Sequence, residues 1–406
     1  MPRKMSMSAE VKTAMDAGFY RIFETQPERY FSAPGRTEIS GNHTDHQQGR
    51  VLAAAVNLDT RAAVRVNGTD TIRVCSKGYP PVEICVKKLA PVEEEKNTTA
   101  ALIRGVAAGF SLLGCRVEGF DAYVESTVLP GSGLSSSAAF EVLMATVINH
   151  LFFGGRASGP EMAKIGQFAE NVFFGKPCGL MDQMASAVGG LVSIDFADKD
   201  DPVITPVDFD FSKTGYALCI IDSRADHADL TEEYAAIPGE LRAVSEHFGK
   251  DVLTQVAEEA FYASIPILRE KCGDRAVLRA IHIYEENRRV PMQVAALESG
   301  DFAEFLRLEN ESGLSSWLYL QNVQPAGSIR EQALALTLAL CRRYLQGRGA
   351  CRVHGGGFAG TVQAFVPEDV LADFRRETES VLGAGCCHIL SVRPQGGVPM
   401  EPEETC

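Results

Sequence analysis

The segment from residue 32 to residue 56, SAPGRTEISGNHTDHQQGRVLAAAV, contains several side chains that could take part in chemistry. Its first fifteen positions hold an Arg, a Glu, two His and an Asp, while Gly residues interrupt it and apolar residues flank it. Two His and one Asp in one turn are metal-ligand types, but further ligands at an obvious spacing are missing. We therefore interpret the segment as part of a site that binds a polar molecule.

A second segment, VLPGSGLSSSAAFEVLMATVINHLFF, places a Gly-rich turn and three Ser residues at the start of a long apolar helix. The first turn of a helix leaves backbone N–H groups without partners and carries the positive end of the helix dipole, so phosphate is a natural ligand there. An ordinary helix cap needs only one Ser. A Walker loop requires a Lys in the motif G-x-x-x-x-G-K-[ST], and this segment has none. The segment therefore indicates a phosphate-binding loop of another class.

Two further segments contain residues of interest. KPCGLMDQMASAVGGL has Asp182 just after a Cys-Gly turn in an apolar setting, where a carboxylate either caps a helix or does chemistry. VHGGGFAGTVQAFV matches the dinucleotide pattern G-x-G-x-x-G at Gly355, Gly357 and Gly360, but a β-branched strand follows instead of a helix. The chain also lacks the G-x-S-x-G elbow of a lipase-like hydrolase. Taken alone, this glycine cluster indicates a tight turn between two strands.

These residues must be positioned by the elements around them, and the first half of the chain is predicted to mix helices and strands. We expect an N-terminal helix and then strands between residues 50 and 87, with a two-residue hairpin turn at Asn67-Gly68. Helical periodicity covers residues 97–113 and 134–153, on either side of the strand GFDAYVEST. A further helix is expected from about Pro160 to Phe174.

The second half is predicted to form a separate α+β unit. The Asp- and Pro-rich stretch 196–215 is the best candidate boundary, which divides the chain into domains at 1–205 and 206–406. We expect a strand YALCIIDS, several helices up to about residue 346, and two short strands, ACRVHG and TVQAFV. A helix over 368–382 and a last strand, HILSVRP, complete the pattern. A chain of two domains predicts a cleft between them.

Composition restricts the classes of function. The 406 residues include 39 Lys and Arg against 53 Asp and Glu, a formal net charge of -14, which disfavours nucleic acid and anionic membranes as partners. Any anionic ligand must therefore be held by local donors. No apolar run is long enough for a membrane span and the N-terminus lacks a signal-peptide pattern, so we expect a cytoplasmic protein. Eleven Cys without C-x-x-C pairs predict reduced, mostly buried thiols.

Taken together, the motifs resemble those of the galactokinase group of the GHMP small-molecule kinases. The Gly-Arg start with its H-T-D turn, LPGSGLSSSAA, AENVFFGKPCGLMDQ and RVHGGGFAGTV occur in the order and spacing of that group. DSRADHADLTEEY and IHIYEENRRV also resemble galactokinase segments, so the likeness covers nearly the whole chain. It implies an α+β fold with an N-terminal domain of the ribosomal-protein-S5-like type, a ferredoxin-like C-terminal domain, and an active site between them.

The resemblance also implies a reaction, in which ATP with Mg²⁺ phosphorylates the anomeric hydroxyl of galactose. Asp182 would accept the proton of that hydroxyl, and Arg36 would keep Asp182 ionised and steady the phosphoryl group. Ser137 and Glu170 would bind Mg²⁺. The ATP phosphates would lie on the loop formed by Gly131, Ser132, Gly133, Leu134, Ser135, Ser136 and Ser137. The sugar would be bound by Asn42, His43, Asp45, Gly179 and Tyr234.

The first motif departs from the galactokinase signature G-R-x-N-[LIV]-I-G-[DE]-H-x-D-Y at Glu38, Ser40, Asn42 and His46. Asn42 matters most, because the acid at this place in galactokinases takes the 6-hydroxyl of the sugar, whereas an amide carries no charge. Plant galacturonate kinases of the same superfamily also lack the acid and share the sequence D-H-Q, found here at Asp45–Gln47. Because most of the chain resembles galactokinases, galactose is the first expected substrate and galacturonate the second.

A non-catalytic sensor of galactose and ATP is the third hypothesis. Some galactokinase relatives that regulate transcription have lost residues of the Ser-Ser-Ala loop, whereas this chain keeps that loop together with Glu170, Asp182 and Arg36. An enzyme is therefore the preferred interpretation. A small-molecule sugar is the expected partner, and the chain is expected to be a monomer or a weak dimer.

Overall fold

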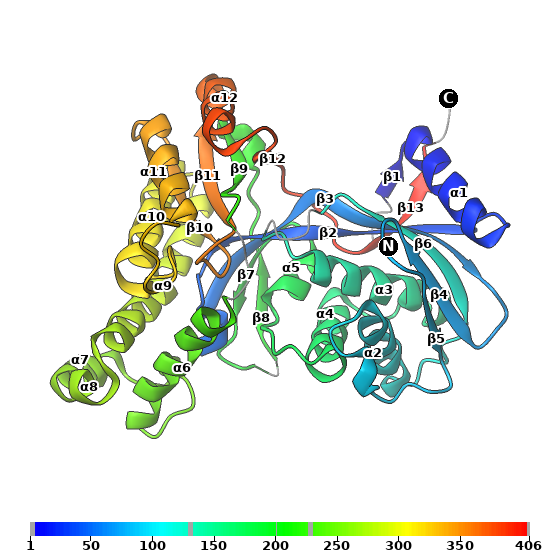
Figure 1. Cartoon of the computed structure of the whole chain (residues 1–406), viewed down its shortest axis with the longest axis horizontal. Helices are drawn as coiled ribbons and strands as arrows, with labels where there is room; N and C mark the ends of the chain where they lie inside the picture. The colour runs from blue at the N-terminus through cyan, green and yellow to red at the C-terminus, as the bar shows by residue number, and fades with distance from the viewer. Residues whose placement is uncertain (1–4, 129–132, 200, 226–229, 404–406) are drawn as a thin grey trace.

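Two β-sheets organise the chain, each with helices packed against it (Figure 1). The computed structural model describes residues 5–128, 133–199, 201–225 and 230–403. Helices and strands are mixed along the chain, so the α+β class expected from the sequence is confirmed. The long strands β2 and β3 extend from one lobe of the molecule toward the other (Figure 1).

The larger sheet has the order β1, β13, β2, β3, β6, β4, β5, with β7 beside β3 and β8 beside β7. Its strands are β1 Met5–Met7, β2 Arg29–Ser40, β3 Arg50–Val66, β4 Thr71–Ser76, β5 Val82–Cys85, β6 Phe120–Ser126, β7 Leu191–Asp195, β8 Val203–Pro206 and β13 Val398–Pro402. Strand β13 lies between β1 and β2, so both ends of the described chain belong to this sheet. The division into domains at 1–205 and 206–406 stays a prediction, and the structure adds that residues 398–402 return to the sheet of the first half.

Four helices, α2 to α5, cover one face of this sheet and lie below it in Figure 1. The helices of this lobe are α1 Ala9–Phe23, α2 Thr99–Leu112, α3 Ser136–Phe152, α4 Gly159–Phe168, its π-helical continuation η3 Ala169–Phe174, and α5 Met181–Val188. Apolar side chains of the sheet and of α2 to α5 form one buried core. The helices expected at 97–113, 134–153 and 160–174 are therefore confirmed.

The hairpin expected at Asn67-Gly68 is wrong. Strands β3 and β4 flank this turn, but β6 lies between them, antiparallel to β3 and parallel to β4. The side-chain amide of Asn67 donates hydrogen bonds to the Asp121 carboxylate of β6 at 2.8 Å and to the Thr71 carbonyl at 3.0 Å. The backbone N–H of Asn67 also donates to the Gly119 carbonyl at 3.2 Å. Asn67 thus holds the turn around the start of β6, which a local turn signal cannot reveal.

The smaller sheet forms the other lobe, in the order β10, β11, β9, β12, with neighbouring strands antiparallel. Its strands are β9 Tyr216–Asp222, β10 Ala350–His354, β11 Thr361–Pro367 and β12 Cys387–Leu390. The helices of this lobe are α6 Thr231–His247, α7 Glu258–Ala263, α8 Ile265–Cys272, α9 Asp274–Glu298, α10 Phe302–Ser315, the π-helix η6 Ser316–Leu320, α11 Ala333–Leu345 and α12 Leu371–Leu382. The strands expected in the second half are confirmed, although the last one ends earlier than expected.

The sequence does not predict β2, the strand that carries Arg36 and Glu38. After Arg29 the strand is buried along its whole length, and a strand covered on both faces lacks the alternation that marks a half-buried strand. Its pairing with β3 shifts register between Pro34 and Arg36 and again between Glu38 and Ser40. Such irregularities re-aim side chains. The first chemical motif therefore lies on an irregular strand that extends toward the second lobe.

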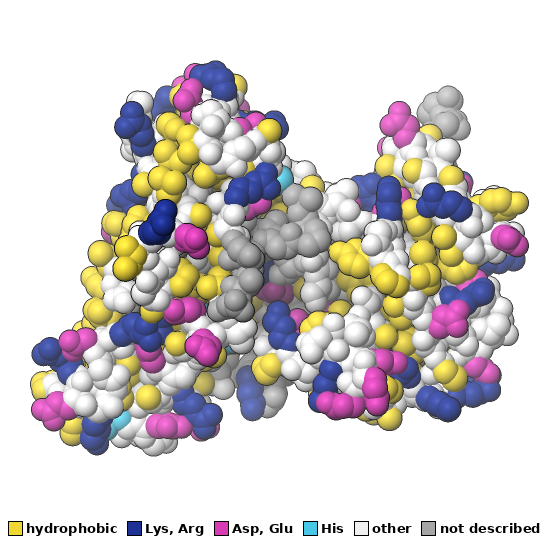
Figure 2. Space-filling view, viewed as in Figure 1, with side chains coloured by type: hydrophobic (Ala, Val, Ile, Leu, Met, Phe, Trp, Pro, Cys, Tyr) yellow, Lys and Arg dark blue, Asp and Glu magenta, His cyan; other side chains and the backbone are white. Residues whose placement is uncertain are grey.

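Lys and Arg side chains are interspersed with Asp and Glu over the face drawn in Figure 2. Within the described ranges, the structure contains no helix whose length and apolarity would let it cross a membrane. Ten cysteines are described, and all ten are free thiols, seven of them buried. The expectation that most thiols are buried is therefore confirmed for these ten residues, and their reduced state stays a prediction.

Candidate active site

Asp182 and Arg36 form an ion pair at the centre of the candidate site. Asp182 lies in the first turn of α5, and Arg36 approaches it from β2, with 2.7 Å between Arg36 Nε and Asp182 Oδ1. Ser135 donates a hydrogen bond to the other carboxylate oxygen, and Arg36 also donates to the Gly133 carbonyl. A strand, the Ser-rich loop and a helix, which are far apart in the sequence, therefore meet at one carboxylate.

The surroundings of Asp182 keep its carboxylate ionised. Burial favours the neutral acid, but the charge of Arg36 and hydrogen bonds from Arg36 and Ser135 outweigh it, so the pKa of Asp182 lies below its usual value. The Asp182 side chain is nevertheless 34% exposed. An oriented, ionised and accessible carboxylate can accept a proton from a hydroxyl group that is bound next to it.

Two cavities meet at this ion pair. We call them the turn cavity, of about 260 Å³, and the loop cavity, of about 380 Å³. Both are lined by Arg36, Lys176, Asp182, Gly355 and Gly356. The turn cavity is also lined by Asn42, His43, Asp45 and Gly179. The loop cavity is also lined by Ser135, Ser136, Ser137, Glu170 and Tyr234. The structure thus brings the two predicted catalytic residues together with the predicted sugar-binding residues and with described members of the predicted phosphate-binding set.

Tyr234 lies apart from the other predicted sugar-binding residues. It lines the loop cavity rather than the turn cavity, and its hydroxyl donates a hydrogen bond to the Gly357 carbonyl at 2.9 Å. Gly356, beside it, leaves little room, because a Cβ at position 356 would fall 2.7 Å from the Tyr234 ring. The glycine cluster is the predicted turn between two strands, β10 and β11, and it also lines both cavities.

His43 and Asp45 are held in the turn cavity by contacts across the site. His43 bonds through Nε2 to the Gly356 carbonyl at 3.0 Å, and burial lowers the pKa of His43 to about 3, so the neutral ring carries its proton on Nε2. Gly179 lies directly against Asp45, because a Cβ at position 179 would fall 2.2 Å from Asp45 Oδ2. A larger residue at position 179 would therefore displace the Asp45 carboxylate.

Asn42 is fully buried, and its side-chain amide is hydrogen-bonded within the protein. Its Nδ2 donates to Glu38 Oε1 at 3.0 Å and to the Gly355 carbonyl at 2.7 Å. Its Oδ1 accepts from Asn322 Nδ2 at 2.8 Å, and its backbone carbonyl accepts from His282 Nε2 at 3.0 Å. Asn42 therefore joins the turn to three parts of the second lobe. Its direct contact with a sugar stays a prediction.

Glu38 and Arg352 form a buried ion pair behind Asn42. Arg352, on β10, lies 2.5 Å from Glu38 Oε1, and both side chains are almost completely buried. A second nitrogen of Arg352 donates to the Ile39 carbonyl at 2.7 Å. Burial raises the pKa of Glu38 above its usual value, although the charge of Arg352 opposes this. The pair binds β2 to β10 and leaves Glu38 within hydrogen-bonding distance of Asn42.

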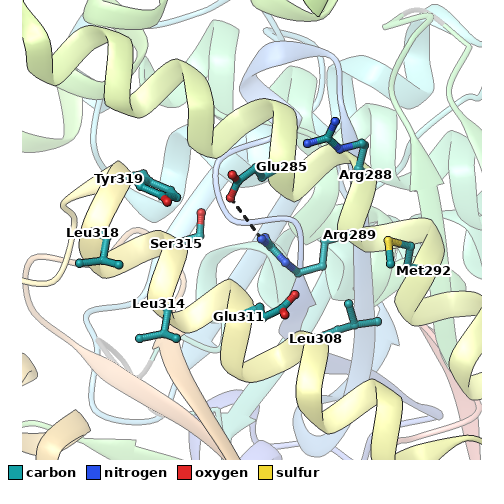
Figure 3. A pocket seen from close by; sticks show the side chains of 10 residues that line it. All are labelled: Glu285, Arg288, Arg289, Met292, Leu308, Glu311, Leu314, Ser315, Leu318 and Tyr319. Atoms are coloured by element: carbon teal, nitrogen blue, oxygen red, sulfur yellow. Dashed lines mark ion pairs between the residues drawn. The ribbon is translucent and has the colours of Figure 1, made fainter.

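A second buried acid, Glu286 on α9, supports the same turn. It accepts the backbone N–H of Gly41 at 3.1 Å and the hydroxyl of Ser312 at 2.7 Å. Burial opposes its ionisation, but the paired charge of Arg289 prevails and lowers the pKa of Glu286 to about 2. Figure 3 shows Arg289 pointing toward Glu285 in a cavity between α9 and α10, outside the candidate site. The turn therefore rests on fixed charges of the second lobe.

Two buried carboxylates, Glu141 and Glu170, lie next to the Ser-rich loop. Gln183 Nε2 lies 2.9 Å from an oxygen of each, and Ser137 Oγ donates to Glu141 Oε1 at 2.8 Å. Burial and the nearby Glu170 raise the pKa of Glu141 to about 8. Glu170 stands in the π-helix η3, a conformation that is frequent at functional sites. The predicted residues Ser137 and Glu170 thus lie at one site, and the sequence reasoning missed Glu141, which sits inside an apolar helix.

The oxygen atoms of Ser137, Glu141 and Glu170 form a group that fits Mg²⁺. Mg²⁺ prefers hard oxygen ligands and is usually held by one or two carboxylates together with substrate phosphates. A bound dication would also offset the charge of two carboxylates that now share a buried site. Within the described ranges, no group of three or more His, Cys, Asp or Glu is arranged to hold a metal ion. The turn with His43 and His46 therefore gains no support as a metal site of its own.

The Ser-rich loop enters α3 as the sequence predicts. Ser135 adopts a left-handed conformation with φ of 54° directly before the first turn of the helix. Leu134 is buried, and its carbonyl accepts the backbone N–H of Arg36 at 3.1 Å. Two residues of the predicted phosphate-binding set, Gly131 and Ser132, lie outside the described residues. The other members of that set line the loop cavity or, in the case of Leu134, support it.

A third cavity, of about 280 Å³, adjoins the start of α3. Ser136 and Ser137 line it and also line the loop cavity, so the two cavities are neighbours. Tyr79, Phe140 and Phe174 contribute aromatic walls. A cavity with aromatic walls beside a loop that is predicted to bind phosphate suits a flat heterocyclic base. The sequence reasoning did not find this cavity, because its walls come from separate segments.

Two family patterns match the chain. The pattern described as "GHMP kinases N terminal domain" matches residues 99–190, and the "Galactokinase galactose-binding signature" matches residues 17–66. The first includes the Ser-rich loop and Asp182, and the second includes β2 and the turn with Asn42, His43 and Asp45.

Whole-chain relatives agree with these patterns. A galactokinase from Streptomyces coelicolor is 32% identical over 368 residues, which span 89% of this chain and 90% of the relative. The crystal structure of Lactococcus lactis galactokinase complexed with galactose superposes with a TM-score of 0.81 at 23% identity, covering 95% of this chain and 99% of the other. The mevalonate kinase of Methanococcus jannaschii superposes with a TM-score of 0.61 at 12% identity, covering 90% and 98%. The GHMP kinase fold expected from the sequence is therefore confirmed.

Proposed function

Because the chain belongs to the galactokinase family, we propose that it transfers the γ-phosphoryl group of ATP to the anomeric hydroxyl of galactose, giving galactose 1-phosphate and ADP. The ion pair of Asp182 and Arg36 carries this proposal, because it lies where the turn cavity and the loop cavity meet. The segment that matches the galactose-binding signature supplies part of the wall of the turn cavity, and the Ser-rich loop lines the loop cavity. A sugar hydroxyl and a terminal phosphate would thus approach each other beside one carboxylate.

In the proposed reaction the anomeric oxygen forms a bond to the γ-phosphorus while the bond to the β,γ-bridging oxygen breaks. The bridging oxygen leaves with the electron pair as part of ADP, and Asp182 accepts the proton of the anomeric hydroxyl. Arg36 keeps Asp182 ionised before the transfer. Positioning and electrostatics are the main requirements of this chemistry, since the protein forms no covalent bond to the phosphoryl group.

The nucleotide would occupy the loop cavity and its neighbour. We propose that the phosphates bind at Ser135 to Ser137 and that the adenine base occupies the cavity lined by Tyr79, Phe140 and Phe174. Ser137, Glu141 and Glu170 would hold Mg²⁺, which when bound neutralises phosphate oxygens. The net charge of the chain is -14, so the protein as a whole does not attract an anionic nucleotide. These local groups must therefore hold the nucleotide.

The two alternatives are not favoured. Galacturonate would require a partner for a carboxylate at carbon six, but Asn42 is buried and both hydrogens of its amide are donated to protein oxygens. A non-catalytic sensor would not need Asp182 held ionised between the two cavities, as it is here. The relatives and the galactose-binding signature support the catalytic reading. The cytoplasmic location and the oligomeric state remain predictions.

A sugar panel tests the proposal. The purified protein would be incubated with ATP and Mg²⁺ and with galactose, galacturonate, N-acetylgalactosamine or glucose, and ADP release would be recorded for each. We expect turnover to be fastest with galactose, and the product to carry its phosphate on the anomeric carbon by ³¹P and ¹H NMR. Faster turnover with galacturonate would favour that substrate instead. Calorimetric binding of galactose without ADP release would favour the sensor.

A further inference from the structure

We propose that Lys176 contacts the phosphoryl group during its transfer and is a further catalytic residue of this site. The inference rests on the proposed sugar kinase activity. Both cavities are lined by the two catalytic residues, by two glycines and by Lys176. Of these residues, Lys176 is the one charged side chain that has no role in the reaction proposed above.

Lys176 projects from a loop whose backbone is fixed. The π-helix η3 ends at Phe174 and is capped by Gly175, and the backbone N–H of Lys176 then donates to the Glu170 carbonyl at 3.2 Å. Two residues later, the backbone N–H of Cys178 donates to Asn171 Oδ1 at 2.8 Å. The base of the side chain is therefore held on the wall that the turn cavity and the loop cavity share, while the long side chain stays free to turn.

Lys176 is the cation on this shared wall that can pair with a further anion. Among the described residues, only Arg36 and Lys176 combine a lasting positive charge with a place in both cavities. Arg36 is already committed to Asp182 and to the Gly133 carbonyl. The side chain of Lys176 is 66% exposed, and its ammonium lies 3.8 Å from Glu170 Oε1, at the outer limit of an ion pair. A loose, exposed pair of this kind costs little to exchange for another anion.

Acidic side chains surround the position at which the phosphoryl group would be transferred, so a cation is needed there. Glu141, Glu170 and Asp182 are three acidic side chains near the position where the γ-phosphoryl group would bind, and each would repel its oxygens when ionised. Lys176 is close enough to help keep Asp182 ionised, so its charge already acts at the point of transfer. An ammonium on a flexible stem can follow the phosphoryl group as it passes from ADP to the sugar.

Lys176 keeps its proton throughout the step. The anomeric oxygen forms the new bond to phosphorus, the β,γ-bridging oxygen leaves with its electron pair on ADP, and Asp182 takes the hydroxyl proton. Lys176 then stabilises the negative charge on the non-bridging oxygens of the transferring group. That charge is most accessible to the ammonium group in the transition state. The residue should therefore act on kcat more than on the binding of galactose.

Matched lysine variants test this role. Lys176→Met removes one of the two positive charges from the shared wall. Lys213→Met is the control, because Lys213 is 81% exposed, lies 3.3 Å from the carboxylate of Asp210, and lines neither cavity. We expect Lys176→Met to lower kcat by about 10- to 100-fold, with the KM for galactose changed less than about threefold. Lys176→Arg should retain most of the activity, Lys213→Met should match the wild type, and all three should melt at the wild-type temperature because both lysines are exposed.

A binding experiment separates transition-state contact from nucleotide binding. ADP would be titrated with galactose and Mg²⁺ present, with and without aluminium fluoride, which mimics the transferring phosphoryl group. Aluminium fluoride should tighten ADP binding to the wild type at least tenfold more than to Lys176→Met, while ADP alone should bind both equally. Equal tightening, or equal kcat for Lys176→Met and Lys213→Met, would overturn the role of Lys176 while the wild type still makes galactose 1-phosphate. A wild type without any sugar turnover would instead overturn the proposed function.

Discussion

The substitution Asn42→Asp gives the sharpest test of how the sugar-facing turn is held. The change keeps the shape of the side chain but replaces an amide that donates two hydrogen bonds with a carboxyl group. In the structure the amide nitrogen lies 3.0 Å from Glu38 Oε1 and 2.7 Å from the Gly355 carbonyl, and the side chains of Asn42 and Glu38 are buried. The variant would therefore place a second carboxyl group against the oxygen of Glu38.

The expected penalty follows from the distance. Two carboxylates about 3 Å apart repel each other by roughly 5.5 kcal/mol at an effective dielectric constant of about 20, which corresponds to about four pKa units. One of the two groups must therefore keep a proton at pH 7. Since an unfolded Asp has a pKa of about 3.9, holding that proton at pH 7 costs about 4 kcal/mol, and losing one donated hydrogen bond adds roughly 1 to 3 kcal/mol.

The sign of the pH dependence distinguishes this penalty from ordinary disruption. The folded variant binds one proton more than the unfolded chain, so it loses stability as the pH rises toward the raised pKa of the carboxyl pair. Between pH 5 and pH 7 the deficit in the free energy of unfolding of the variant, relative to the wild type, should grow by about 2.7 kcal/mol, at 1.36 kcal/mol per pH unit. The free energy of unfolding in urea, measured for both proteins at pH 5, 6 and 7, gives this difference directly.

The double variant Glu38→Gln/Asn42→Asp is the control. It removes the second carboxylate and leaves Arg352 to pair with the new Asp, so the growing deficit should disappear. A deficit of Asn42→Asp that stays constant within about 0.5 kcal/mol from pH 5 to pH 7 would refute the reasoning, because the two side chains would then not share a site.

Two other predictions concern buried charges. Arg352→Met leaves the Glu38 carboxylate buried without its ion-pair partner, so we expect the free energy of unfolding, measured in urea at pH 7, to fall by about 3 to 5 kcal/mol. The double variant Arg352→Met/Glu38→Gln should lose clearly less, and equal losses would argue against the pair. Glu141→Gln removes one carboxylate from the group that fits Mg²⁺. In a Mg²⁺ titration of the steady-state rate, the Mg²⁺ concentration for half-maximal turnover should therefore rise about tenfold. An unchanged concentration would exclude Glu141 from that group.

Local patterns predict most elements of this fold, and they fail where distant parts of the chain decide. The helix after the Ser-rich loop and the strands of the second lobe follow from periodicity and turn residues. Strand β2 escapes prediction because it is covered on both faces. The turn at Asn67-Gly68 looks like a hairpin, but the side chain of Asn67 bonds to β6, which arrives more than fifty residues later.

The candidate site shows the same limit. The motifs give Arg36, Asp182 and the Ser-rich loop, because each lies in a short segment whose residue types suggest chemistry. The pairing of Glu38 with Arg352 joins residues at opposite ends of the chain, so no spacing rule contains it. The shared place of Lys176 in both cavities likewise depends on how the η3 helix ends, and only the folded structure reveals it.

The most direct test of the central claim is the rate of galactose 1-phosphate formation by Asp182→Asn, measured by ³¹P NMR with ATP and Mg²⁺, together with calorimetry of galactose binding. If Asp182 accepts the anomeric proton at the junction of the two cavities, kcat should fall by about 10²- to 10⁴-fold while the Kd for galactose changes less than about threefold. A variant that binds galactose normally and makes galactose 1-phosphate within tenfold of the wild-type rate would contradict the account.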